Sequence, residues 1–108
     1  MSRIPPDEAH FTQVNVFHTK PEDQQRLFDA MSAGADAMGR HEGCVSVSMH
    51  LSADGTRLIS ITEWKKQADF EAMRARSDLK TYFKEVGGII TAVDPAACRI
   101  AYRNQVSE

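Results

Sequence analysis

Two alternating runs of residues, 44–51 and 57–64, flank a short polar turn and restrict this chain to folds that contain a β-hairpin. Their sequence, CVSVSMHLSADGTRLISITEW, switches between apolar and polar residues with the period of two that is typical of half-buried strands. The turn contains Asp54-Gly55, and a glycine there can adopt the positive φ that a tight hairpin turn requires. The stretch therefore predicts two antiparallel strands.

The rest of the chain supplies further strands and helices in a regular order. Residues 11–18, FTQVNVFH, alternate and predict a first strand. A helix is expected from about Thr19 to Arg40, because apolar residues recur there at helical spacing: Leu27, Met31, Ala35 and Met38. The remaining expected elements are a short helix over 65–76, a helical segment over 79–86 ended by Gly87-Gly88, and a last strand over 96–103.

The order β-α-β-β-α-β predicts an α+β protein with a ferredoxin-like βαββαβ fold and a four-stranded antiparallel sheet. Its helices would cover one face of that sheet, which leaves the other face for water or a partner. The length of 108 residues suits one domain, expected over 11–103. A flexible N-terminal arm over 1–10 and a C-terminal tail over 104–108 would flank it.

Composition excludes several classes of function. The 13 Lys and Arg residues are scattered and the net charge is −2, which argues against a nucleic-acid partner. No apolar run approaches the ~20 residues of a membrane span, and the polar N-terminus does not resemble a signal peptide, so a cytoplasmic protein is expected. Cys44 and Cys98 lack metal-ligand spacing and are expected to be reduced. No metal site or other cofactor motif is present in the sequence.

Alternation assigns the strand residues to two faces, one nearly all apolar and one mixed. The apolar face would carry Val14, Val16, Val45, Val47, Met49, Ile59, Ile61, Cys98, Ile100 and Tyr102. The mixed face would carry Phe11, Gln13, Asn15, Phe17, Ser46, Ser48, His50, Leu58, Ser60, Thr62, Trp64, Ala97, Arg99 and Ala101.

Two geometries fit the mixed face, and the sequence leaves both open. If it meets solvent, its large apolar residues are unusually exposed. If it is covered, it lines a partly wet pocket, because ligand pockets combine apolar walls with a few polar groups. Each unpaired polar group in a dry interior would cost ~1–3 kcal/mol, so these groups would pair with one another or bind a ligand.

The stretch HLSADGTRLISITEWKKQADFEAM resembles the antibiotic biosynthesis monooxygenase family of the dimeric α/β-barrel superfamily. The resemblance is carried by Gly43 before the second strand, His50 near its end, the Asp54-Gly55-Thr56 turn, and Trp64 before an amphipathic helix. The order of elements matches over about residues 11–103. The resemblance implies a homodimer whose two sheets close into a barrel, with a pocket between sheet and helices in each subunit.

The resemblance also implies an activity, that of a cofactor-independent monooxygenase that oxidises a small aromatic or polyketide-like substrate with O₂. A phenol or anthrone would lose a proton, and the resulting carbanion would pass an electron to O₂. The protein would position the substrate, hold its oxyanion and exclude bulk water. The chain departs from the quinone-forming members at three positions, where Ser60 replaces Asn, Phe70 replaces Tyr and Lys84 replaces Arg.

The residues expected to carry the chemistry are Asn15, His50, Ser60 and Trp64. His50 or a bound water would take the proton, Asn15 and Ser60 would hold the oxyanion, and Trp64 would position the ring. The other substrate-binding candidates are Phe17, Ser48, Thr62, Phe70, Lys84 and Arg99. Structural roles remain open for several of these residues: a solvated strand end for His50, a core anchor for Trp64, a bond to a neighbouring strand for Asn15 and a paired charge for Arg99.

Two other functions fit the same fold. One is a non-catalytic dimeric barrel that binds a small ligand. The other is a haem-degrading monooxygenase, for which Asn15 stands at a suitable position on the first strand. The helical region 67–86 contains neither Trp nor His, however, so haem iron would have no axial histidine there.

Overall fold

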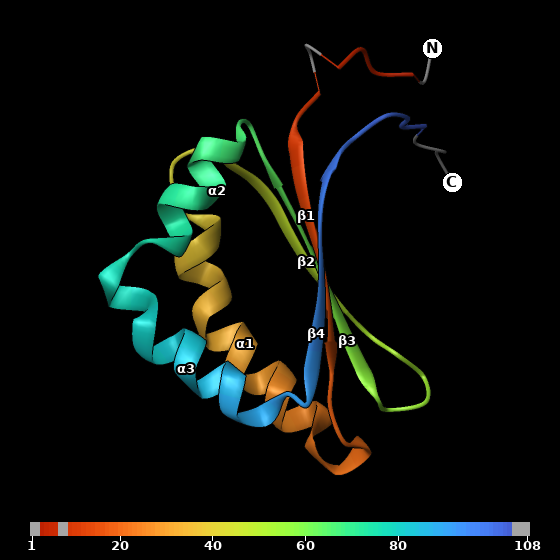
Figure 1. Cartoon of the computed structure of the whole chain (residues 1–108), viewed down its shortest axis with the longest axis vertical. Coiled ribbons are helices and arrows are strands. Elements are labelled where there is room, and N and C mark those ends of the chain that lie inside the picture. Colours follow the sequence, from red (N-terminus) through yellow and green to blue (C-terminus); the bar gives the residue numbers. More distant parts are fainter. Residues whose placement is uncertain (1–2, 7–8, 105–108) are drawn as a thin grey trace.

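Four strands form a single antiparallel sheet in a computed structural model that describes residues 3–6 and 9–104. In chain order they are β1 (Phe11–His18), β2 (Cys44–Leu51), β3 (Arg57–Trp64) and β4 (Ala92–Arg99). They lie in the order β2-β3-β1-β4. Three helices lie together on one face of the sheet (Figure 1): α1 (Gln24–Gly39), α2 (Gln67–Arg74) and α3 (Lys80–Ile89). The predicted ferredoxin-like α+β fold is confirmed.

The long helix α1 forms where the sequence predicts it. A short 3-10 turn, η1 (Pro21–Asp23), leads into it, with proline and acidic residues at the positive end of the helix. The buried residues of α1 form one stripe along the helix: Leu27, Met31, Gly34 and Met38. This stripe faces the sheet and α3, and it contributes to two adjoining parts of the core, one around Leu27 and one around Trp64.

The last strand begins at Ala92 rather than at the predicted Ala96, and it ends at Arg99 rather than at Arg103. In the sequence, Pro95 disfavours a strand at its position, because proline cannot donate a hydrogen bond to a neighbouring strand. Within the described residues, however, β4 pairs with β1 alone and lies at the edge of the sheet, where a strand tolerates proline. Arg99 lies opposite Phe11 in this register.

Helix α3 continues past the point where the sequence predicts its end. Gly87 and Gly88 are exposed within the helix, which runs to Ile89. Each glycine costs a helix roughly 1 kcal/mol relative to alanine. Val86 and Ile89 are buried in the core around Leu27, and their burial offsets that cost, so tertiary packing overrides the local signal.

Strand β2 contains a β-bulge near its start. Cys44 lies opposite Trp64, but Ser46 lies opposite Glu63, so Val45 is an extra residue without a partner of its own in the ladder. A bulge of one residue shifts the alternation of every residue that follows it to the other face.

The bulge reverses the expected faces of β2. Val47 and Met49 pair with Thr62 and Ser60 and face the helices, whereas Ser48 and His50 face away from them. The prediction that Ser46, Ser48 and His50 share a face with Ser60, Thr62 and Trp64 is therefore wrong. The predicted position of Val47 and Met49 on the opposite face is wrong for the same reason.

On the central strands β1 and β3 the predicted faces hold, and the mixed face is the covered one. Asn15 pairs with Ser60, and both line the space between sheet and helices. The apolar face of these strands points away from the helices, and its central residues are half-buried: Val14, Val16, Ile59 and Ile61. Of the two geometries left open by the sequence, the covered mixed face is thus the one that forms.

Glu63, on the uncovered face of β3, bonds to one residue that precedes β1 and to one that follows β4. Its carboxylate is bonded by His10 and, at 2.7 Å, by the guanidinium of Arg103. Burial by itself raises the pKa of Glu63, but the hydrogen bonds from His10 and Arg103 outweigh it and hold the pKa below its usual range. In the predicted arm, Arg3 forms a bridge with Tyr102. Residues 1–2 and 7–8 of that arm and the tail from 105 lie outside the described residues.

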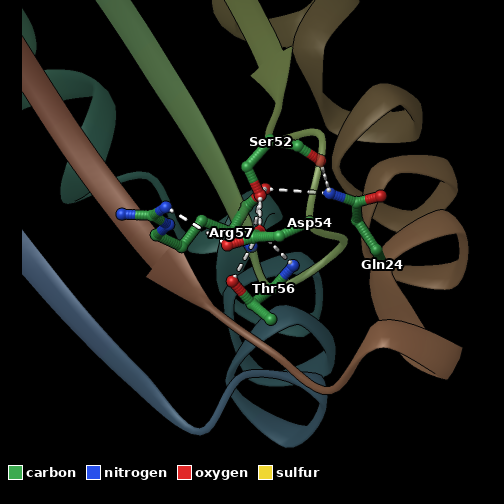
Figure 2. A network of polar contacts seen from close by, with 5 residues as sticks. All are labelled: Gln24, Ser52, Asp54, Thr56 and Arg57. Atoms are coloured by element: carbon green, nitrogen blue, oxygen red, sulfur yellow. Dashed lines mark hydrogen bonds and ion pairs between the residues drawn. The ribbon is translucent and has the colours of Figure 1, made fainter.

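The turn between β2 and β3 is held by hydrogen bonds to one carboxylate oxygen of Asp54 (Figure 2). Ser52 Oγ and Thr56 Oγ1 each donate to this oxygen at 2.7 Å, and the Thr56 backbone N–H donates at 3.0 Å. Gln24 Nε2, at the start of α1, donates to the carbonyls of Ser52 and Arg57 and ties the hairpin to the helix. The bonds from Thr56 and Ser52 lower the pKa of Asp54 far below its usual range.

We expect Asp54→Asn to lower the melting temperature at neutral pH, because the charged acceptor of the turn is lost. The folded-state pKa is depressed, so this stabilisation is fully present above the unfolded pKa of ~3.9 and declines as the pH falls below that value. Thermal melts at pH 7 and pH 3 measure the effect, and the difference from wild type should shrink at pH 3. Asp36→Asn, on the exposed side of α1, serves as the control. An equal deficit at both pH values would contradict the charge-based explanation.

Candidate active site

A cavity of ≈ 340 Å³ lies between the mixed face of the sheet and the three helices. Its volume falls in the lower part of the ~300–1,000 Å³ range of small-molecule sites. Strands β1 and β3 form its floor, β2 and β4 its sides, and the helices its roof. Four lining residues are also exposed and mark the rim where the cavity meets solvent: Arg74, Gly87, Val93 and Pro95.

The polar groups of the floor come from neighbouring positions on β1 and β3. Gln13 Nε2 donates to Asn15 Oδ1 at 2.9 Å, so the amide NH₂ of Asn15 remains available to a ligand. The Ser60 hydroxyl bonds no described residue, and no fully buried polar side-chain atom of the described residues lacks a partner. The Ser60 oxygen is therefore accessible from the cavity. Asn15 and Ser60 together present two free donors to whatever occupies this space.

Trp64 lies on the same face of β3 as Ser60 and Thr62, beyond Thr62 along the strand. Its indole is completely buried and packs against Met38, Met73 and Leu79. Its Nε1–H donates to Thr62 Oγ1 at 2.8 Å. Because the Thr62 oxygen accepts this bond, its own hydroxyl hydrogen is free to point into the cavity that Thr62 lines. Trp64 itself does not line the cavity, so it acts on the site through Thr62.

The walls of the cavity are built from flexible thioethers and aromatic rings. The methionines are Met31, Met38, Met49 and Met73, and the aromatic residues are Phe17, Phe70, Tyr82 and Phe83. Methionine adapts its shape to irregular ligands, and rings offer flat surfaces for stacking. The ring of Phe70 also contacts that of Trp64, with centroids 5.8 Å apart. Such walls suit a flat apolar molecule.

Tyr82 belongs to α3 and lines the cavity where this helix packs against α1. Its ring lies against Gly34, where an added Cβ would come within 2.5 Å of the ring. Its hydroxyl donates to the carbonyl of Met31 at 3.5 Å. Burial raises the pKa of Tyr82 to about 12, so the phenol stays protonated and serves only as a neutral hydrogen-bonding group.

Five of the ten predicted site residues line the cavity together: Asn15, Phe17, Ser60, Thr62 and Phe70. Trp64 is adjacent through Thr62. Ser48 and His50 lie on the opposite face of the sheet, because of the bulge in β2. Lys84 is exposed on α3 outside the cavity lining, and Arg99 lies near the end of β4, in a separate hollow with His10 and Lys65.

Sequence reasoning missed most of the residues that form the walls of the cavity, and it missed Arg74, which supplies the positive charge among the described lining residues. Val47 and Met49 were hidden by the bulge, which leaves no clear local signal in the sequence. Tyr82 and Val86 lie four residues apart, the spacing of one helix face, and this signal could have placed them near the sheet. Arg74 gave no signal, because a lone arginine at a helix end resembles any solvated residue.

Among the residues that the structure describes, no group of three or more His, Cys, Asp and Glu side chains gathers at a possible metal site. Cys44 and Cys98 are free and half-buried. Burial raises the pKa of the Cys44 thiol, which disfavours the thiolate that a nucleophile or metal ligand needs. No helix in the described part of the chain is long and apolar enough to cross a membrane.

Comparison with known proteins assigns the family. The model of the antibiotic biosynthesis monooxygenase family matches residues 10–85, which include β1 to β3, α1, α2 and the polar floor of the cavity. This chain is a member of the antibiotic biosynthesis monooxygenase family. Membership confirms the resemblance carried by the hairpin and Trp64, and it places the chain among monooxygenases.

Individual relatives agree with this assignment. The tetracenomycin-F1 monooxygenase of Streptomyces glaucescens is 39% identical over 84 residues, which cover 77% of this chain and 75% of the relative. The structure of SnoaB, a cofactor-independent oxygenase from Streptomyces nogalater, superposes with a TM-score of 0.72 at 17% identity, covering 92% of this chain and 98% of SnoaB. A conserved protein from Methanosarcina mazei has a TM-score of 0.78 at 16% identity, with 85% and 93% covered. At these low identities the two structures support the fold alone.

Proposed function

We propose that this member of the family is a cofactor-independent oxygenase that converts an aromatic, anthrone-like substrate to a ketone or quinone with O₂. The observation that carries the proposal is the polar floor of an otherwise apolar cavity, where Asn15, Ser60 and Thr62 offer hydrogen-bond donors from two paired strands, with Asn15 directly opposite Ser60. The relationship to an enzyme named for tetracenomycin F1 supports an aromatic substrate.

The floor donors suit the oxyanion that forms when an anthrone loses its proton. Removal of a proton from the methylene carbon gives a carbanion whose negative charge is shared with the oxygen of the anthrone carbonyl group. Asn15 Nδ2–H and the Ser60 O–H would donate to that oxygen. Fixed donors in a site that excludes water stabilise such a charge more than water does, because they need no reorganisation.

The oxidation then needs only the substrate and O₂. The carbanion passes one electron to O₂, and the resulting radical and superoxide combine to form a C–O bond. Protonation gives a hydroperoxide, which loses water as the remaining C–H proton leaves and the carbonyl forms. One oxygen atom ends in the product and the other in water, so the substrate supplies all the electrons.

The first proton would pass to water rather than to a side chain. Among the described residues that line the cavity, none carries a carboxylate or an imidazole. His50 lies on the other face of the sheet and does not reach the substrate. The contribution of the protein is thus to stabilise the conjugate base and to position it for O₂.

We also propose that the protein is a homodimer formed through the uncovered sheet face, with the two sheets closing into a barrel. The central residues of that face are apolar and lie side by side on β1 and β3: Val14, Val16, Ile59 and Ile61. An apolar sheet face needs a cover, and a second copy offers an identical one. The cavity lies on the other side of the sheet, so each subunit would keep its own site.

The proposal is tested by oxygen uptake with dithranol, an anthrone, and purified protein in the presence of a chelator. We expect the wild type to consume O₂ and to release the oxidised ring as product. Ala35 lies on α1 and lines the cavity, so Ala35→Phe should fill part of it and reduce uptake at least tenfold. His50→Ala is the matched control and should retain wild-type activity, because His50 lies outside the site.

The outcomes separate the alternatives. Binding of dithranol without any oxygen uptake would contradict the enzyme proposal and favour the non-catalytic ligand-binding protein. Loss of uptake in His50→Ala, with a normal melting temperature, would contradict the site. A melting curve of Ala35→Phe shows whether its loss of activity arises from unfolding, and a titration of dithranol binding to the folded variant resolves that case.

A further inference from the structure

We propose that Arg74 makes the cavity selective for aromatic substrates that carry a carboxylate or another anionic group at the end away from the reacting ring. This inference rests on the proposed function, because it assumes an aromatic ligand whose oxygen lies against Asn15 and Ser60. It adds a second point of recognition at the rim, on the opposite side of the cavity from the floor.

The guanidinium of Arg74 is held between two aromatic rings of the cavity wall. Its Cζ lies 5.9 Å from the ring centroid of Phe70 and 5.7 Å from that of Phe83. Both distances are within the ~6 Å range of cation–π contacts. Arg74 is the last residue of α2, and it is both exposed and part of the cavity lining. The positive charge therefore lies at the rim, against the aromatic wall of the cavity.

The hydrogen-bond donors of this guanidinium are not used elsewhere in the described part of the chain. Four other arginines have carboxylate partners: Arg26, Arg57, Arg76 and Arg103 pair with Asp23, Asp54, Asp78 and Glu63. Arg3, Arg40 and Arg99 have none among the described residues, but these three do not line the cavity. Arg74 has no such partner among the described residues, and the described cavity lining contains no acidic side chain. Its positive charge is left for a ligand.

The positions of the hydrogen-bond donors would determine the orientation of a bound ligand. The neutral donors of Asn15, Ser60 and Thr62 lie on the floor, and Arg74 is the only fully charged side chain among the described lining residues. A flat molecule between the methionines and phenylalanines would place its reacting oxygen at the floor and its acidic group at Arg74. Guanidinium also matches the planar fork of a carboxylate, which a single ammonium does not.

Binding of two matched probes tests the inference: anthracene carboxylate and its uncharged methyl ester, each titrated by fluorescence at low salt. We expect Arg74→Met to weaken the carboxylate at least tenfold and to leave the ester within twofold. Arg74→Lys should give an intermediate loss, since it keeps the charge but not the fork. Lys84→Met, which removes an exposed cation outside the cavity, is the control and should change neither probe.

The results distinguish failure of this inference from failure of the proposed function. If both probes bind the wild type and Arg74→Met weakens them equally, Arg74 contributes packing rather than anion recognition. If only the ester binds, the cavity takes aromatic ligands but rejects anions, which overturns the inference and leaves the oxygenase proposal intact. If neither binds, both are contradicted, because a cavity that accepts no flat aromatic molecule is not the site proposed.

Discussion

Replacing Trp64 with alanine is expected to lower the free energy of unfolding by about 3–5 kcal/mol, the usual cost of deleting a fully buried large aromatic side chain. Trp64 has no exposed surface and is surrounded by Met38, Met73 and Leu79 from three helical segments. A domain of this size has about 5–15 kcal/mol of stability in total. Urea denaturation at neutral pH measures the loss.

Trp64→Phe separates the two roles that the sequence leaves open for this residue. Phenylalanine keeps most of the buried volume but removes the Nε1 donor to Thr62, which costs about 1 kcal/mol. If Trp64 acts as a core anchor, this variant stays folded and retains the affinity for dithranol. A folded variant that no longer binds dithranol would instead show that the indole, by itself or through its bond to Thr62, is needed for substrate binding.

The second large effect is expected at Asn15. Asn15→Asp keeps the oxygen that accepts the bond from Gln13, but it replaces the free NH₂ donor with a group that repels an oxyanion. We expect kcat to fall by about 100- to 1,000-fold, as for the loss of one oxyanion-hole donor, and KM to change little. Initial rates of oxygen uptake over a range of dithranol concentrations give both constants.

Two controls define this result. Gln13→Met removes the residue that orients the Asn15 amide but leaves the donor in place, so its effect on kcat should be much smaller. Ser48→Ala, on the far face of the sheet, should have none. A wild-type kcat in Asn15→Asp would show that Asn15 takes no part in the mechanism. Ser60 and Thr62 would then be the donors that stabilise the oxyanion.

The order of elements, the ferredoxin-like fold and the family follow from the sequence alone, because they depend on local signals. Three such signals are the hairpin turn at Asp54-Gly55, the alternation of β1 and β3, and the apolar stripe of α1. Each can be recognised within one short segment of the sequence, and the structure contains all three features. The same alternation places Asn15, Ser60 and Thr62 on one face, but only the structure shows that this face is the covered one.

Tertiary structure alone decided which residues complete the site. The extra residue Val45 in β2 moves His50 out and Met49 in, and nothing near it in the sequence indicates a bulge, because a valine there fits a regular strand equally well. Pro95 is accepted because β4 lies at an edge, and α3 continues through two glycines because Ile89 is buried. Arg74 lines the cavity, where its guanidinium contacts the rings of Phe70 and Phe83 on two different helices. Each of these outcomes depends on contacts between different helices and strands, which local periodicity does not encode.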